Sequence, residues 1–132
     1  MLRAVLFEPG DTLTRLDDEE GLALASTTHA LLDALRERGL RVALVAARAE
    51  PPELEARVDA VAPSLDAALA AVDASPAEAL WVGAGAAGVR EAAARGLATA
   101  QAYWFRADED GGAGFSAFTQ MDIINLVKRL GD

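Results

Sequence analysis

Apolar and polar positions divide the chain into two kinds of segment. Short runs that are apolar almost throughout, at residues 3–7, 41–45, 58–61, 79–82 and 97–102, predict buried strands of a parallel sheet. Between these runs, apolar residues recur at intervals of three and four, the spacing of one helix face. This alternation predicts an α/β fold: a three-layer, Rossmann-like parallel sheet with helices on both faces.

The longest helix is expected to begin at Asp17 and Asp18, which can cap its N-terminus, and to run to about Arg38 before Gly39. Its apolar face would carry Leu24, Thr28, Leu31, Leu32 and Leu35. Further helices are predicted at about 51–57, at 65–72 behind Ser64, at 88–95 before Gly96, and at 122–130. Residues 75–78 predict a single turn, and the acidic, glycine-rich residues 108–114 predict a flexible loop.

Candidate chemistry gathers where the predicted strands end. In open parallel sheets the functional crevice lies beyond the carboxyl ends of the strands. The loops after the first, second and fourth strands are therefore expected to meet at one mouth, with Glu8 directly after the first strand. Because a tight turn after a buried strand can hold a catalytic acid, Glu8 is a candidate catalytic residue.

Composition narrows the classes of protein that fit. The chain of 132 residues predicts one domain over 1–132. Its net charge of −9 argues against nucleic-acid binding, and no apolar run approaches the roughly 20 residues of a membrane span. With no cysteine and no evident signal peptide, a cytoplasmic location is expected. Abundant alanine, with arginine used in place of lysine, suggests a bacterial source.

The loop after the fourth predicted strand carries a glycine pattern that is typical of nucleotide binding. Gly83, Gly85 and Gly88 satisfy the Gly-x-Gly-x-x-Gly spacing of dinucleotide-binding loops, after a predicted strand and before a predicted helix. The pattern follows the fourth strand rather than the first, however, and its helix ends early, at Gly96. Binding of a nucleotide cofactor is therefore kept as a third hypothesis.

Three segments together resemble another family. The stretch VGAGAAGVREAAARGLATA (82–100) resembles the fourth motif of the haloacid dehalogenase (HAD) superfamily, in which a strand ends in Gly-Asp and a second acid follows. EPGDTL (8–13) resembles the first motif, Asp-x-Asp-Gly-Thr-Leu, and RGLRVALVAA (38–47) resembles the second. The order of the motifs also matches, which implies a HAD-like fold. Between Leu13 and the second strand there is no room for a sizeable cap domain.

The resemblance also implies where catalytic groups would lie, and most of those groups are replaced. The nucleophile position is Glu8, the acid–base position is Gly10, and Asp11 and Thr12 follow. The hydroxyl and lysine positions that hold phosphate are Ala46 and Ala62, and the single lysine of the chain is Lys128. The fourth-motif acids fall at Ala84 and Gly88, beside Gly83. A metal site is not expected, because one glutamate and a displaced aspartate do not supply the set of oxygen ligands that Mg²⁺ needs.

These replacements favour a catalytically degenerate member that acts as a binding, scaffold or regulatory module, with no cofactor. The alternative is an atypical Mg²⁺-dependent phosphatase or hydrolase that uses Glu8 and Asp11. A homodimer or an unidentified protein is the expected partner, because aromatic residues are enriched at interfaces. Five of the aromatic residues lie close together in the sequence: Tyr103, Trp104, Phe105, Phe115 and Phe118. The same residues could instead cover the sheet edge and hold the last helix.

Overall fold

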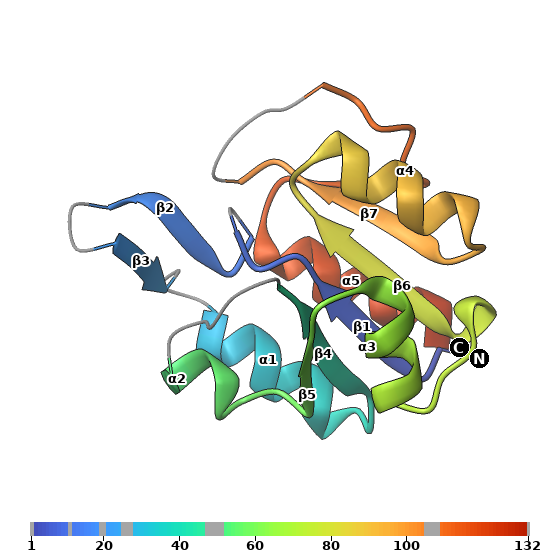
Figure 1. Ribbon diagram of the computed structural model, residues 1–132, viewed down its shortest axis with the longest axis horizontal. Coiled ribbons are helices and arrows are strands. Elements are labelled where there is room, and N and C mark those ends of the chain that lie inside the picture. Colours follow the sequence, from blue (N-terminus) through green and yellow to red (C-terminus); the bar gives the residue numbers. More distant parts are fainter. Residues whose placement is uncertain are drawn as a thin grey trace.

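The computed structural model describes residues 2–10, 12–18, 21–24, 28–46, 52–104 and 109–131. Six parallel strands form the central sheet in the order β5-β4-β1-β6-β7-β8 (Figure 1). In chain order they are β1 (Ala4–Phe7), β4 (Arg41–Val45), β5 (Ala60–Ala62), β6 (Ala79–Gly83), β7 (Ala98–Ala102) and β8 (Phe115–Ala117). The predicted parallel α/β sheet is confirmed.

Helices cover both faces of the sheet, as predicted. One face carries α1 (Thr28–Glu37), the short α2 (Pro52–Glu55) and α5 (Gln120–Gly131). The other carries α3 (Leu65–Ala71), capped by Ser64, and α4 (Ala86–Ala94). A 3₁₀ turn (Pro76–Glu78) leads into β6, where a single turn was expected. None of the helices within the described ranges is long and apolar enough to cross a membrane.

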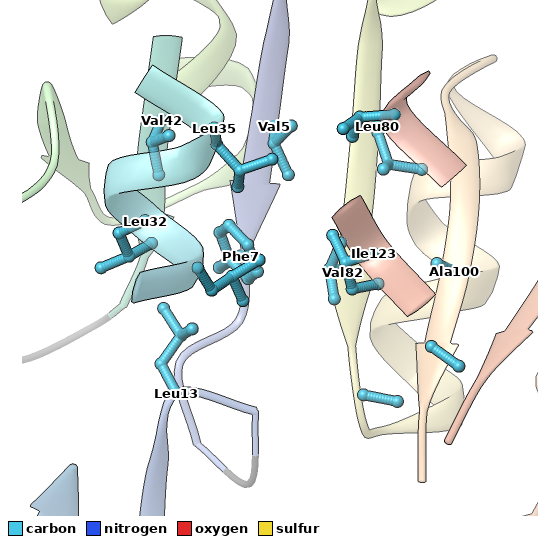
Figure 2. Packing of buried hydrophobic residues seen from close by; sticks show 14 of the residues in the cluster. Val5, Phe7, Leu13, Leu32, Leu35, Val42, Leu80, Val82, Ala100 and Ile123 are labelled. Carbon is cyan, nitrogen blue, oxygen red and sulfur yellow. The ribbon is translucent and has the colours of Figure 1, made fainter. Parts of the chain in front are cut away.

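Alternation along the central strands divides the core in two. On β1, Val5 and Phe7 point toward α1 and α5, whereas Ala4 and Leu6 point toward α3 and α4. Figure 2 shows the first of these clusters, in which leucines of α1 and Ile123 of α5 pack on side chains of β1 and β6. By the same alternation, the residue after Phe7 faces α4, and this places Glu8 near the start of that helix.

The first helix begins later than the sequence pattern predicted. Asp17 and Asp18 do not cap a helix; a hairpin of β2 (Thr14–Asp18) and β3 (Gly21–Leu24) precedes it, apart from the main sheet (Figure 1). The two aspartates are instead the last residues of β2, and Asp18 pairs with Gly21 of β3. Helix α1 begins at Thr28, whose hydroxyl donates to the Leu13 carbonyl oxygen (3.0 Å). Leu24, assigned to the helix face, therefore lies in β3.

Other boundaries move by one or a few residues. Helix α4 begins at Ala86, so Gly88 lies inside its first turn rather than at its start. The third strand covers 60–62 rather than 58–61, and α5 covers 120–131 rather than 122–130. The three-residue β8 was not predicted, because it is short and follows a glycine-rich loop. Gly39 and Gly96 end α1 and α4 with φ of 81° and 90°, as expected for C-terminal glycines.

Part of the loop that the sequence predicted to be flexible is tied to β7. The fully buried Gln101 donates to the carbonyl oxygens of Glu109 (2.9 Å) and Ala84 (3.2 Å). Its side-chain oxygen accepts the Gly111 N–H (2.9 Å). Gly111 lies so close to α4 that an added Cβ would come within 2.9 Å of the Ala86 carbonyl oxygen. One side chain therefore links this loop, β6 and β7.

We expect Gln101→Leu to lower the free energy of unfolding by about 2 kcal/mol, because it leaves three backbone groups, two of them buried, without their partner. Denaturant unfolding measures the change. Hydrogen exchange at the Gly111 amide should accelerate in the variant. The control Ser116→Ala, at an exposed position of β8, should stay within about 0.5 kcal/mol of the parent. Unchanged stability and exchange in Gln101→Leu would contradict the assigned role.

Candidate functional site

The turn after β1 is closed by its own polar groups. The Glu8 N–H donates to the Val82 carbonyl oxygen (3.0 Å) and so extends the pairing of β1 with β6. The Thr12 hydroxyl donates to the carbonyl oxygens of Glu8 and Pro9, and the Leu13 N–H also donates to Pro9 (2.9 Å). Thr12 is fully buried. Its hydroxyl therefore serves the turn and does not face a ligand.

Two side chains from distant segments hold the same turn against the body of the protein. The Thr12 carbonyl oxygen accepts from the indole N–H of Trp104 (2.9 Å) and from the amide of Gln120 (3.2 Å). Gln120 also donates to the Thr28 hydroxyl (3.2 Å), at the start of α1. The turn is thus fixed to the end of β7, to α1 and to α5.

The Glu8 carboxylate is directed to the N-terminus of α4. Its Oε1 accepts the N–H of Gly85 (3.2 Å), the N-cap residue of that helix. Helix N-termini carry partial positive charge and unpaired N–H groups, so an acidic side chain stabilises them. Glu8 is half-buried. The predicted nucleophile position thus lies where its carboxylate caps a helix.

The two positions of the fourth-motif acids lie against other side chains. Ala84 is buried, with 1% of its surface exposed. A Cβ added at Gly88 would lie 3.0 Å from Cζ2 of Trp81 and 3.2 Å from Oε2 of Glu8. At Gly83 an added Cβ would come within 2.8 Å of the Trp81 Nε1. The glycines therefore leave room for the Trp81 indole and for Glu8.

Trp81 is the residue of this site that the sequence analysis did not identify. It lies on β6, is 4% exposed, and its indole Nε1 is buried without a hydrogen-bond partner. A buried donor without a partner costs free energy, so the packing of the ring must compensate. The available signal was a large aromatic residue two positions before Gly83, since close packing of an indole favours glycine neighbours.

The positions corresponding to the phosphate-holding groups meet at the edge between β4 and β5. The Ala46 N–H donates to the Ala62 carbonyl oxygen (2.9 Å), so the two residues are adjacent. Both side chains are methyl groups, and Ala62 is 5% exposed. These two side chains offer neither a hydroxyl nor an ammonium group.

The residues that the structure describes do not fit a Mg²⁺ ion. Mg²⁺ needs an octahedral set of oxygens that usually includes one or two carboxylates. Gly10, Ala84 and Gly88 supply no side-chain oxygen, and Oε1 of Glu8 is bonded to Gly85. Across the described ranges, no group of three His, Cys, Asp or Glu side chains could hold a metal. The second candidate acid, Asp11, lies outside the described residues.

The aromatic residues proposed as an interface divide into two groups. Trp104 and Phe115 are partly buried against the core, and the Arg129 guanidinium lies over the Phe115 ring (5.9 Å). Tyr103 stacks on Phe118, with ring centroids 5.5 Å apart, and 65% of Phe118 is exposed. Phe105 lies outside the described residues. The aromatic cluster thus covers the sheet edge in part and leaves one ring in solvent.

Comparison with known proteins identifies the fold. No protein-family model matches the sequence, and no curated protein matches it significantly. A predicted phosphatase from Clostridium acetobutylicum superposes with a TM-score of 0.77 at 13% identity, over 98% of this chain and 99% of that one. L-2-haloacid dehalogenase from Xanthobacter autotrophicus gives a TM-score of 0.77 at 14% identity, over 97% and 99%.

A further solved structure, a HAD phosphatase from Thermococcus onnurineus, matches with a TM-score of 0.67 at 20% identity. That match covers 83% of this chain and 59% of the other chain. Phosphatases and dehalogenases thus share this arrangement of strands and helices. At sequence identities this low, the structural similarity shows a common fold and does not show a common activity. The chain has a HAD-like fold, and the residues that the structure describes include no large cap domain.

Proposed function

We propose that this chain is a catalytically degenerate HAD-like protein that acts as a binding, scaffold or regulatory module. The observation that carries the proposal is the packing around Gly88, where Trp81 and the Glu8 carboxylate occupy the space an acidic side chain would need. Loss of an acid by drift alone would leave an open pocket, whereas here the position is filled. On this proposal the protein retains the fold, and the residues around Gly88 pack against one another rather than bind a substrate.

The state of Glu8 supports the same proposal. A nucleophilic carboxylate must approach its substrate to about 3–3.5 Å along a defined line. Here one carboxylate oxygen accepts the Gly85 N–H, and the other lies beside Gly88. A neighbouring acid–base group is also required, and Gly10 cannot transfer a proton. The side chain is therefore assigned a structural role at the α4 N-terminus.

This role predicts that replacing Glu8 destabilises the protein. We expect Glu8→Ala to lower the free energy of unfolding by about 1 kcal/mol, because the helix loses its capping acceptor. Glu8→Gln, which keeps an acceptor but loses the charge, should cost less. Denaturant unfolding of both variants tests the proposal. A catalytic residue tends to behave in the opposite way, since active sites trade stability for function. Stabilisation by both variants would therefore contradict it.

The alternative function is a Mg²⁺-dependent hydrolase that uses Glu8 with Asp11. It would act on a phosphate ester or anhydride, and it requires that Asp11 take over the proton transfer that Gly10 cannot perform. It predicts metal-dependent turnover that Glu8→Gln abolishes. The absence of a hydroxyl at Ala46 and of an amine at Ala62 weighs against it, because nothing at those positions would hold the phosphate.

Binding of a nucleotide cofactor remains the third hypothesis. The glycine spacing that suggested it has another explanation, because Gly83 and Gly88 make room for Trp81 and Glu8. The Gly85 N–H, which a pyrophosphate would use, is also bonded to Glu8. We expect NAD to leave the melting temperature unchanged. A ligand at 100 times its dissociation constant would instead add about 2.7 kcal/mol of stability, which a thermal scan detects.

A second copy of the chain is the partner that we propose to test first. Phe118 and Met121 are 65% and 59% exposed and lie on either side of the α5 N-terminus. Phe118 directly follows β8, the edge strand of the sheet, and edge strands are common sites of association. Trp104 is unsuited to the test, because its hydrogen bond to Thr12 makes it structural.

We therefore expect a concentration-dependent dimer in sedimentation experiments that the double variant Phe118→Ser, Met121→Ser converts to monomer without loss of stability. Exposed side chains contribute little to the folded state, so the variant should melt close to the parent. The exposed but smaller Val61→Ser, at the opposite edge strand, serves as control. A parent protein that is monomeric at all concentrations would rule out this partner.

A further inference from the structure

Three arginines line one cleft at the end of the sheet opposite the candidate site. The cleft has a volume of about 410 Å³ and is formed by Arg3, Arg38 and Arg41 with apolar side chains of Leu2, Leu40 and Val127. Arg3 precedes β1, and Arg41 is the first residue of β4. Glu8 follows the other end of β1. Five residues of strand separate Arg3 from Glu8, which corresponds to about 16 Å between their backbones. The two places are therefore separate.

Positive charge at this cleft is unusual for this chain. The sequence has 12 basic and 21 acidic residues, yet three of the basic ones line a single cleft. Arg3 forms an exposed pair with Glu78 (3.6 Å). The side chains of Arg38 and Arg41 form no ion pair or hydrogen bond with the described part of the chain, and both residues are exposed. Their guanidinium groups are thus available to a ligand.

The local backbone explains how the arginines come together. Gly39 adopts a φ of 81° and ends α1, and the Leu40 N–H bonds back to the Leu35 carbonyl oxygen (3.2 Å). This sharp turn leads directly into β4, whose first N–H, that of Arg41, donates to the Arg3 carbonyl oxygen (3.0 Å). The backbones of residues 3 and 41 are therefore paired. The turn at Gly39 brings Arg38 to the same cleft.

We propose that this cleft binds a small organic phosphate. Arginine guanidinium groups present planar forks of donors that match phosphate oxygens. The volume lies within the range of pockets that hold small molecules, and the leucine and valine side chains could contact an apolar part of the ligand. Nucleic acid is disfavoured, because it needs an extended basic surface and the chain is strongly acidic. The inference stands apart from the function proposed for Glu8.

Calorimetric titration with pyrophosphate, a minimal probe, tests the site on the full chain. The double variant Arg38→Gln, Arg41→Gln should bind it at least tenfold more weakly than the parent. The matched control Arg90→Gln, Arg95→Gln removes the same charge from exposed ion pairs on α4 and should bind within about twofold of the parent. Equal weakening by both pairs, or no binding to the parent at millimolar pyrophosphate, would overturn the proposal.

Two further readouts locate the ligand and identify its chemistry. In an NMR titration the amide signals of Gly39 and Leu40 should shift, whereas that of Gly85, beside Glu8, should not. Shifts confined to Gly85 would place the anion at the other end of the sheet and overturn the assignment. Citrate, a multiply charged carboxylate, should bind more weakly than pyrophosphate. Equal binding would contradict recognition of phosphate.

Discussion

Trp81→Ala should lower the free energy of unfolding by about 3–5 kcal/mol, a melting-temperature loss of roughly 10 °C or more for a chain of this length. The side chain is 4% exposed, and it fills the space left by Gly83 and Gly88. Removing it leaves a cavity next to glycines that carry no side chain to fill it. Thermal and denaturant unfolding of purified variants measure the loss.

A second substitution at the same position separates packing from hydrogen bonding. Because the Trp81 Nε1 is buried without a partner, Trp81→Phe removes an uncompensated donor as well as some volume. The two effects oppose each other and are each on the order of 1 kcal/mol, so the variant should lie within about 1 kcal/mol of the parent. A loss as large as that of Trp81→Ala would show that the indole N–H has a partner in solution.

Gly88→Asp should destabilise the protein by about 2 kcal/mol or more, relative to Ala87→Asp. Both substitutions add an acid to the first turn of α4, where acids are normally favourable. Position 87 is exposed, so its acid should be neutral or slightly stabilising. At position 88 the new side chain meets Trp81 and brings a second carboxylate beside that of Glu8.

This comparison tests the packed site directly, and unfolding in denaturant provides the measurement. If the position had merely lost its acid and kept an open pocket, the two variants would be equally stable. Equal stability would therefore contradict the packing around Gly88. Gly88→Ala is a third variant for the comparison. Replacing the glycine raises helix propensity, whereas the added methyl group makes a close contact with Trp81, so the two effects on stability oppose each other.

The sheet was predictable because its signals are local. Apolar runs such as 41–45, and glycines such as Gly39, place strands and helix ends with little help from the rest of the chain. The hairpin at 14–24 was not predictable in the same way. Asp17 and Asp18 suit a helix N-cap as well as a strand turn, and the apolar spacing from Leu24 onward continues into α1 by coincidence. Only the pairing of β2 with β3 distinguishes the two structures.

The candidate site was also predictable only as far as its signals are local. The sequence placed Glu8, Ala46 and Gly85 at loops that do lie at neighbouring strand ends, because parallel strands bring their carboxyl ends together. It did not indicate that the Glu8 carboxylate bonds to Gly85, 77 residues away, or that Trp81 fills the gap. Side-chain direction depends on contacts between distant segments. The residue types at these positions were therefore readable from sequence, whereas the contacts that their side chains make were not.

The most direct test of the account is the Mg²⁺-dependent hydrolysis of a generic aryl phosphate by the purified protein and by Glu8→Gln, prepared in parallel. The account predicts equal rates at background level, since Glu8 serves as a helix cap and the described residues around it supply no set of metal ligands. Metal-dependent turnover that is present in the parent and absent in Glu8→Gln would contradict the account, and it would make Glu8 and Asp11 a rearranged active site.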